Sequence, residues 1–176
     1  GYGESEDVVC IFTLPEAVVG SRTIPTSGGG WDWGYLRNIN FYLAHSHRCP
    51  DTAIRERYDG IARFFRAYFY FEKVKRFGDV PWHEKAMASD DTDLTKPRDS
   101  RVFVVEKILE DIDYAIAHIS DKAELYRVTK WTAMALKSRI CLFEGTYRKY
   151  HGIPGYEALL DQCIAVSEEF ITSSPY

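Results

Sequence analysis

The sequence predicts an all-α protein built from antiparallel helix pairs, and three observations support this fold class. Apolar residues recur at spacings of three and four through most of the chain after about residue 33. Capping residues such as Asp51 and Thr129 stand before periodic stretches. Glycine and proline interrupt the pattern, as at Gly78 and Pro81. Pairs of this kind stack into tetratricopeptide-like solenoids with a period of about 34 residues, although no clean sequence repeat occurs at that period.

The first 32 residues are the least regular part of the chain, and we expect an irregular N-terminal segment there. Residues 8–14 fit either a short strand or an extended packing segment, and residues 25–30 have the composition of a flexible Gly-rich loop. The helical scaffold is then expected over residues 33–176. Asp32 is a plausible N-cap for a first helix over about residues 33–46. The residues that share its apolar face are Leu36, Ile39, Asn40 and Leu43.

A long second helix is expected over about residues 53–77, capped by Asp51 or Thr52. Gly78 suits a left-handed cap after its last turn. Its apolar residues form two adjacent stripes, which predicts that it packs between other helices as a core element. The first stripe contains Ile61, Phe64, Tyr68, Phe71 and Val74, the second contains Ala62, Phe65 and Phe69, and the remaining face carries Arg63, Arg66, Tyr70 and Lys73.

Three more helices are expected beyond a polar loop at about residues 78–98. They cover about residues 100–119, 130–150 and 156–172, and Thr129 is placed to cap the second of these. Apolar stripes fall on Val102, Val105, Ile108, Leu109, Ile112, Ala115, Ile116 and Ile119, on Ala133, Leu136, Ile140 and Phe143, and on Leu159, Leu160, Cys163, Val166 and Phe170. A further stripe of Ala135, Ser138, Leu142 and Gly145 contains small residues that allow close helix approach.

Composition excludes several functional classes. The net charge of -4 and the pI near 5.8 argue against a nucleic-acid binder, which usually carries a basic face. No run of about 18 apolar residues is present, so no helix is expected to span a bilayer. The first residues lack the basic and apolar segments of a signal peptide, but a mature or truncated chain would look the same, so the sequence does not decide secretion. The four cysteines, Cys10, Cys49, Cys141 and Cys163, are scattered and do not decide the redox compartment.

The chain also lacks the motifs of an enzyme, so we expect no catalytic residues and no cofactor. Neither a Gly-x-Ser-x-Gly motif nor a phosphate-binding loop occurs. Glu110, Asp111 and Asp113 fall on an amphipathic helix, where we expect them to face water. Arg66 is expected to form a buried ion pair that ties helices together.

Two acidic or metal-like clusters are better explained without a metal. On a helix, His45 and Cys49 share a face while His47 points away, and a zinc site needs four well-placed ligands. Residues 90–93 contain three aspartates, but the spacing, central glycine and final glutamate of a calcium-binding loop are missing. We therefore expect no metal site.

Four segments, in order along the chain, resemble the SusD/RagB family of nutrient-binding lipoproteins from the outer surface of Bacteroidetes-type bacteria. They are residues 36–43 (family pattern IRRANxFL), 65–71 with 77–81 (LRAxxYF…GDVP), 97–100 with 108–116 (PRxS…ILxDLxxAI), and 127–130 with 133–142 (RxTKxAAxALxARxxL). Together they span roughly residues 33–145. The chain departs from the pattern at Trp131, where the family often has a small residue, and at Phe65, which replaces a leucine.

The resemblance implies a function in glycan capture. Members of the family bind oligosaccharides without breaking them, and they act as lids on a SusC-like TonB-dependent transporter at the extracellular face of the outer membrane. They are several hundred residues long, so this chain is expected to be the helical portion of a larger protein. We expect the lipid anchor that would hold the full-length protein on the membrane to lie outside this chain.

The best carbohydrate-binding candidates are Trp31, Asp32, Trp33, Tyr35 and Asn38. Aromatic rings pack on the C–H faces of sugar rings, while neighbouring Asp and Asn side chains take the hydroxyl groups by hydrogen bonds. The alternative for these residues is structural, with one tryptophan anchoring the loop and Asp32 acting only as a cap. The alternative for the whole chain is a helical-repeat scaffold that binds a protein or peptide partner.

Overall fold

The computed structural model describes residues 16, 19–23, 26, 28–88, 90–122 and 126–175. Within these residues the structure is helical, and its only β-type pairing is an isolated antiparallel bridge between Val80 and Asp99. The α-helices are α1 (Gly34–His45), α2 (Thr52–Phe77), α3 (Arg101–His118), α4 (Lys130–His151) and α5 (Tyr156–Ser173), with 3-10 turns η2 (Ser46–Arg48) and η3 (Thr92–Thr95). The predicted all-α class is confirmed, and the predicted helices agree closely with these bounds.

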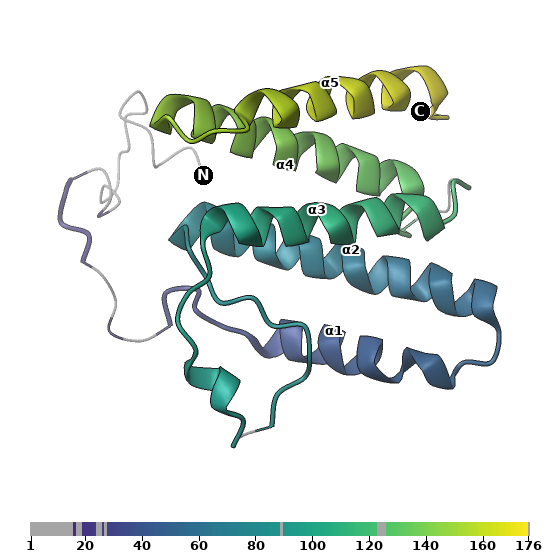
Figure 1. Ribbon diagram of the computed structural model, residues 1–176, viewed down its shortest axis with the longest axis horizontal. Coiled ribbons are helices and arrows are strands. Elements are labelled where there is room, and N and C mark those ends of the chain that lie inside the picture. Colours follow the sequence, from purple (N-terminus) through teal and green to yellow (C-terminus); the bar gives the residue numbers. More distant parts are fainter. Residues whose placement is uncertain are drawn as a thin grey trace, which may run out of the picture. The chain divides into compact units, whose positions relative to one another are not determined.

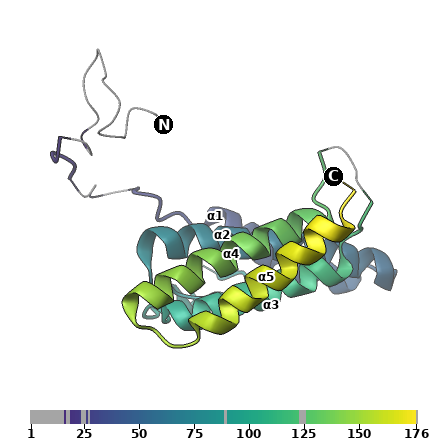
Figure 2. The same ribbon diagram turned by 90° about the horizontal axis from the view of Figure 1, so that it is seen from above.

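The chain divides into two compact units, residues 1–33 and 34–176, and each is described by itself. In the second unit, consecutive helices run antiparallel and form the pairs α2–α3 and α4–α5 (Figure 1). The two pairs meet mainly where α3 packs on α4, and α1 packs on α2. Figure 2 shows α2 and α4 on one side of this stack and α3 and α5 on the other. This is the expected tetratricopeptide-like arrangement. The segment at residues 8–14 lies outside the described residues.

Side-chain caps explain where α2 and α4 begin, and a glycine follows the end of α2. The Asp51 carboxylate accepts a hydrogen bond from the Ile54 amide at 3.0 Å, which selects Asp51 rather than Thr52 as the cap of α2. Thr129 and Thr132 form a reciprocal capping box at the start of α4, as predicted for Thr129. Gly78 follows α2 with φ 69° and ψ -112°, so its predicted positive φ is confirmed, although ψ lies outside the left-handed helical region.

The interface between α2 and α3 forms much of the apolar core. Phe64, Phe71 and Val74 of α2 are buried, as are Ile108 and Ile112 of α3, and these residues belong to the predicted stripes. The second predicted stripe of α2 is less enclosed, because Phe65 is exposed. Helical periodicity therefore located most of this interface correctly.

One face of α2 was assigned wrongly from the sequence. Tyr70 and Lys73 were left on the remaining face of the helix, yet both are buried, and Tyr70 has no exposed surface; Arg66, on the same face, is buried as its expected ion pair requires. Tyr68, which was expected in the core stripe, is exposed. The reason is that this face packs against α1 and the 79–99 loop, where Arg66 donates to Asn40 and the Tyr70 hydroxyl accepts from the His83 amide.

The α4–α5 pair is brought together by small residues, as expected. A Cβ atom added at Gly145 would lie 2.8 Å from Leu160 Cδ2, so glycine permits the close approach. The Ser138 hydroxyl lies 2.8 Å from the Ser167 hydroxyl across the same interface. The other two members of this predicted stripe, Ala135 and Leu142, are exposed.

Trp131 is buried at the end of this pair, where it replaces the small residue of the family pattern. Its indole nitrogen donates to the Asp121 carbonyl at 2.7 Å, and its ring belongs to a cluster with Met134 and Val166. Local packing thus accommodates the larger side chain. None of the helices in the described part of the chain has the length and apolar character needed to cross a membrane.

Candidate functional site

The Trp31–Trp33 motif is ordered locally by glycine geometry. Gly28, Gly29 and Gly30 all have positive φ values, of 74°, 59° and 83°, which side-chain-bearing residues rarely adopt. The Trp31 amide closes this turn by donating to the Gly28 carbonyl at 3.0 Å. The Gly-rich segment therefore sets the direction in which the chain enters the motif.

Within this first unit, the two tryptophan rings contact each other. The Trp31 and Trp33 ring centroids are 5.1 Å apart with an interplanar angle of 77°, an edge-to-face arrangement. Trp31 is 40% exposed, Trp33 is partly buried, and Asp32 between them is exposed. The motif thus presents aromatic surface next to a carboxylate, which is the chemistry expected of a carbohydrate contact.

The other two candidate residues lie in the second unit, on α1. Tyr35 and Asn38 are three residues apart, which places them one helical turn apart on one face. Tyr35 is 76% exposed and Asn38 is also exposed. An aromatic ring and an amide therefore stand next to each other on the surface of α1.

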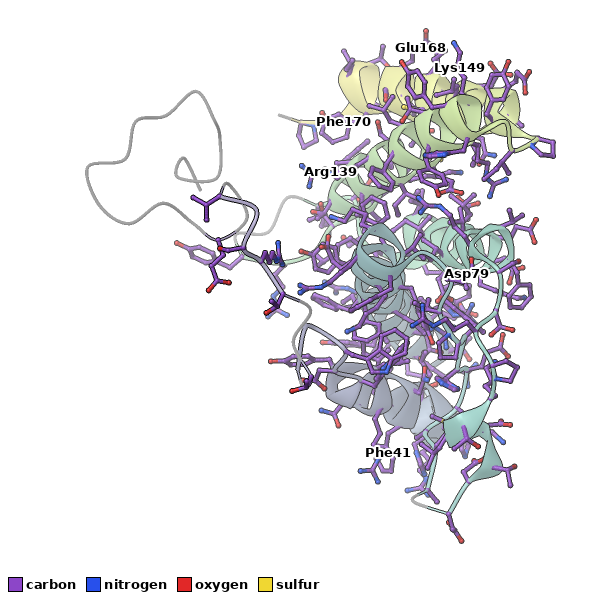
Figure 3. The ribbon with its side chains drawn as sticks, turned by 90° about the vertical axis from the view of Figure 1, so that its left-hand side faces the viewer. Phe41, Asp79, Arg139, Lys149, Glu168 and Phe170 are labelled. Carbon is purple, nitrogen blue, oxygen red and sulfur yellow. The ribbon has the colours of Figure 1, made fainter. Side chains whose placement is uncertain are left out.

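Two further aromatic residues of α1 were missed as candidates. Phe41 is 59% exposed and lies on the side of α1 that faces away from the other helices (Figure 3). Its ring packs against His45, with centroids 4.3 Å apart. Tyr42 is less exposed, and burial, together with the charge and hydrogen bond of Asp59, raises its pKa. The signal that could have found them is their position outside the apolar face of α1.

A buried polar network joins α1, α2 and α3. Arg66 of α2 donates to Asp111 of α3 through Nε at 2.6 Å and through Nη2 at 2.8 Å, forming a bidentate pair. Its Nη1 donates to the Asn40 side-chain oxygen of α1 at 3.1 Å. The Asn40 amide nitrogen then donates to the carbonyls of His83 and Lys85 at 2.8 and 3.3 Å. We call Asn40, Arg66 and Asp111 the first network.

The first network confirms one prediction and corrects another. The expected buried ion pair of Arg66 is present, with Asp111 as its partner. Asp111, however, was expected to face water, and it is only 2% exposed. Its position on α3 faces Arg66 of α2, and a helical pattern alone does not show which carboxylate meets a buried cation. Glu110 and Asp113 are exposed, as expected.

The 79–99 loop is tied to α2 by the buried Tyr70 side chain. The Tyr70 hydroxyl accepts from the His83 amide at 2.7 Å and donates to the Pro81 carbonyl at 3.3 Å. Burial is the main reason why the pKa of Tyr70 lies far above its ordinary value. The Trp82 ring packs on the Tyr70 ring, with centroids 4.2 Å apart. Residues 81–83 of the loop are therefore fixed to the helical scaffold.

The two ends of this loop are joined by Asp99. Its carboxylate accepts from the Trp82 amide at 2.7 Å and from Lys96 Nζ at 2.8 Å. Burial alone would raise the pKa of Asp99, but these two hydrogen bonds and the charge of Lys96 outweigh it and lower that pKa. Asp79, at the start of the loop, accepts from the Arg101 amide at 2.7 Å.

A second network joins α3 to α4. The Glu144 carboxylate, 1% exposed, accepts from Arg101 Nε at 2.7 Å and from Arg148 Nε at 2.8 Å. The Arg101 guanidinium also lies over the Tyr147 ring, 3.6 Å from its centroid. We call Arg101, Glu144 and Arg148 the second network.

The two metal-like clusters of the sequence have other contacts. His45 Nδ1 lies 2.7 Å from the Phe41 carbonyl, one turn earlier on α1. In the acidic loop, Lys85 pairs with Asp91 at 3.7 Å and with Asp93 at 3.4 Å. Across the described residues, no group of three or more His, Cys, Asp or Glu side chains is placed to hold a metal ion.

Comparison with known proteins identifies the family to which this helical-pair fold belongs. Residues 35–142 match the model of a SusD-like family whose description is "starch-binding associating with outer membrane". A SusD-like protein of Formosa agariphila is 30% identical over 118 residues, which cover 66% of this chain and 23% of that protein. The chain belongs to the SusD-like family, and it spans less than a quarter of the length of this relative.

Solved structures agree with this assignment. A SusD-like protein of Bacteroides fragilis matches with a TM-score of 0.65 and 28% identity, over 77% of this chain and 25% of that one. A structure with bound xylogluco-oligosaccharide matches with a TM-score of 0.75 and 20% identity, over 99% of this chain and 35% of that one. A SusD-like carbohydrate-binding protein of Bacteroides vulgatus matches with a TM-score of 0.61 and 16% identity, over 80% and 30%. The last two similarities concern the fold alone.

Proposed function

We propose that this protein binds an oligosaccharide at the extracellular face of the outer membrane, without cleaving it, and passes it to a SusC-like TonB-dependent transporter. Family membership supports this proposal, because the family is described as starch-binding and outer-membrane-associated. The structural relative with bound xylogluco-oligosaccharide extends the candidate ligands beyond starch. In the full-length protein, a lipid anchor would hold this scaffold at the membrane.

Two sets of exposed aromatic and polar side chains carry the proposal, one at residues 31–33 in the first unit and one at residues 35–38 in the second. Trp31 and Tyr35 expose large parts of their rings, and Asp32 and Asn38 place hydrogen-bonding groups beside them in the sequence. Such side chains suit a neutral sugar, since rings cover its C–H faces and amides or carboxylates bind its hydroxyl groups. We propose Trp31, Asp32, Trp33, Tyr35 and Asn38 as the glycan contacts.

Affinity electrophoresis tests the proposal directly. The intact protein should migrate more slowly in native gels that contain starch or xyloglucan than in gels without polysaccharide. Trp31→Ala and Trp33→Ala should each restore most of the mobility while the melting temperature barely changes. An equal loss of glycan binding and thermal stability would instead assign the tryptophans to packing, and migration unaffected by either polysaccharide would count against the proposed ligands.

A second candidate function is docking of a protein or peptide partner, and one surface favours it. The outer face of α2 carries exposed apolar side chains at helical spacing. They are Ile54, Tyr58, Phe65 and Tyr68. Under this alternative, Phe65→Ser would abolish co-purification of the partner while leaving retardation by polysaccharide unchanged. Under the main proposal, co-purification of a transporter barrel is expected, and retardation depends on residues 31–38.

A further inference from the structure

Helix α1 is held to the scaffold by few side chains. Leu36 and Asn40 are its buried residues, and it packs mainly on α2. Leu36 contributes an apolar contact, which has little directional preference. Asn40 contributes hydrogen bonds, which do depend on direction. Asn40 therefore contributes strongly to the rotation and the axial position of α1, beside the hydrogen bond between Tyr42 and Asp59.

The contacts of Asn40 link α1 to two other parts of the scaffold. Its oxygen accepts from Arg66 Nη1 at 3.1 Å, and its nitrogen donates to the His83 carbonyl at 2.8 Å and the Lys85 carbonyl at 3.3 Å. Arg66 is itself fixed by its bidentate pair with Asp111. A side chain only 1% exposed thus connects α1, α2 and the 79–99 loop.

The same helix carries two of the proposed glycan contacts. Asn38 lies two residues before Asn40, and Tyr35 lies five residues before it, or about 7.5 Å along the helix axis. A shift or rotation of α1 would move both exposed side chains together. Binding sites require their groups within about 0.5 Å of the productive geometry.

We propose that Asn40 is a positioning residue for the glycan site, acting through α1 and held in place by Arg66 and Asp111. This inference rests on the proposed function, because it concerns Tyr35 and Asn38 as ligand contacts. Asn40 does not touch the sugar itself. Its role is to set where α1 presents those two side chains.

Asn40→Asp in the intact protein tests this role. The variant keeps an oxygen for Arg66 but loses the N–H donors to the His83 and Lys85 carbonyls. Glu144→Gln is the matched control, because it weakens the second network, which has no side chain on α1. Binding of a malto-oligosaccharide and a xylogluco-oligosaccharide is measured by calorimetry at a temperature where all variants are folded.

We expect Asn40→Asp to weaken oligosaccharide binding by on the order of tenfold, while Glu144→Gln changes it less than about twofold. The amide NMR resonances of Tyr35 and Asn38 should shift in the first variant only. If Asn40→Asp does not fold, Leu36→Val, at the other buried position of α1, should weaken binding in the same direction.

Two results would overturn the inference. In the first, folded Asn40→Asp binds the oligosaccharide as tightly as the wild type. In the second, Glu144→Gln weakens binding as much as Asn40→Asp does, so that affinity follows overall stability. Failure of the proposed function is distinguishable from both, because Tyr35→Ala would then leave binding unchanged or the wild type would bind neither oligosaccharide.

Discussion

The two buried networks differ in how completely they use their arginines. In the first network, all three nitrogens of the Arg66 guanidinium donate hydrogen bonds, two to Asp111 and one to Asn40. In the second network, Arg101 reaches Glu144 through Nε, and its Nη2 is buried without a hydrogen-bond partner among the described residues. Packing of Arg101 on the Tyr147 ring offsets part of that desolvation.

The difference separates two tasks in the same scaffold. The second network fastens one helix pair to the next, where stacking and one good hydrogen bond per arginine are sufficient. The first network fixes the direction of α1 and of the 79–99 loop, and directional hydrogen bonds from a planar guanidinium suit this purpose. The network that includes a residue of α1, the helix that carries Tyr35 and Asn38, is the one in which the arginine makes more hydrogen bonds.

Removing the carboxylate of each network should give the largest losses in the free energy of unfolding. Asp111→Ala and Glu144→Ala should each lower the free energy of unfolding by about 3–5 kcal/mol, because each leaves buried arginine charge without its partner. The loss should be larger for Asp111, which receives both the bidentate Arg66 pair and a hydrogen bond from Arg63 at 3.4 Å. Urea unfolding measures both, and a larger loss for Glu144→Ala would reverse the comparison.

Overpacking the α4–α5 contact should have a smaller effect, confined to the second pair. Gly145→Val would bring a branched side chain against Leu160, whose Cδ2 lies 2.8 Å from the position of an added Cβ. We expect a loss of about 1–3 kcal/mol. Ala135→Val is the control, because Ala135 is exposed on the same helix. Equal losses in the two variants, measured by thermal unfolding, would show that the close contact does not matter.

Removing the N-cap of α4 should lower stability by less than the change at Gly145. Thr129→Ala removes the acceptor for the Thr132 amide, at 3.3 Å, and should lower stability by about 1 kcal/mol. Thr146→Ala on the same helix is the comparison, because that hydroxyl bonds only to carbonyls of its own helix. Chemical unfolding should show a clear loss for the first variant and a smaller change for the second.

His83 in the 79–99 loop predicts a pH effect on stability. Burial, followed by the charge of Lys96, lowers the pKa of His83, although Asp91, Asp93 and Asp99 act in the opposite direction. Below the ordinary histidine pKa near 6.5, the unfolded chain therefore binds the proton more readily than the folded protein, and stability falls as pH falls. His83→Gln should reduce the stability difference between about pH 7.5 and 5.5. An unchanged difference would contradict this assignment.

Much of the fold could be predicted from the sequence because it depends on local patterns. Apolar periodicity located the helices, and cap chemistry located Asp51 and Thr129. The pattern of α2 failed at Tyr70, whose hydroxyl has hydrogen-bonding partners in a loop that follows the helix. The buried position of Asp111 depended on a partner 45 residues away, which periodicity does not encode.

Only part of the proposed site could be predicted from the sequence. The Trp31–Trp33 motif is conspicuous by composition, and its rings do contact each other. The exposure of Phe41 could be predicted from its position outside the apolar face of α1. The role of Asn40 in orienting α1 could not be predicted in this way. Asparagine on an apolar face is visible in the sequence, whereas its carbonyl partners at residues 83 and 85 require the folded loop.

The affinity of the intact protein for an oligosaccharide, compared between two tyrosine variants, tests the central claim most directly. Tyr35 and Tyr150 are both exposed, by 76% and 85%, but only Tyr35 belongs to the proposed site. Calorimetry with malto-oligosaccharide and xylogluco-oligosaccharide should show that Tyr35→Ala raises Kd by about tenfold or more, the loss of about 1.4 kcal/mol of binding free energy. Tyr150→Ala should leave Kd unchanged. Equal affinities of the two variants would contradict the account.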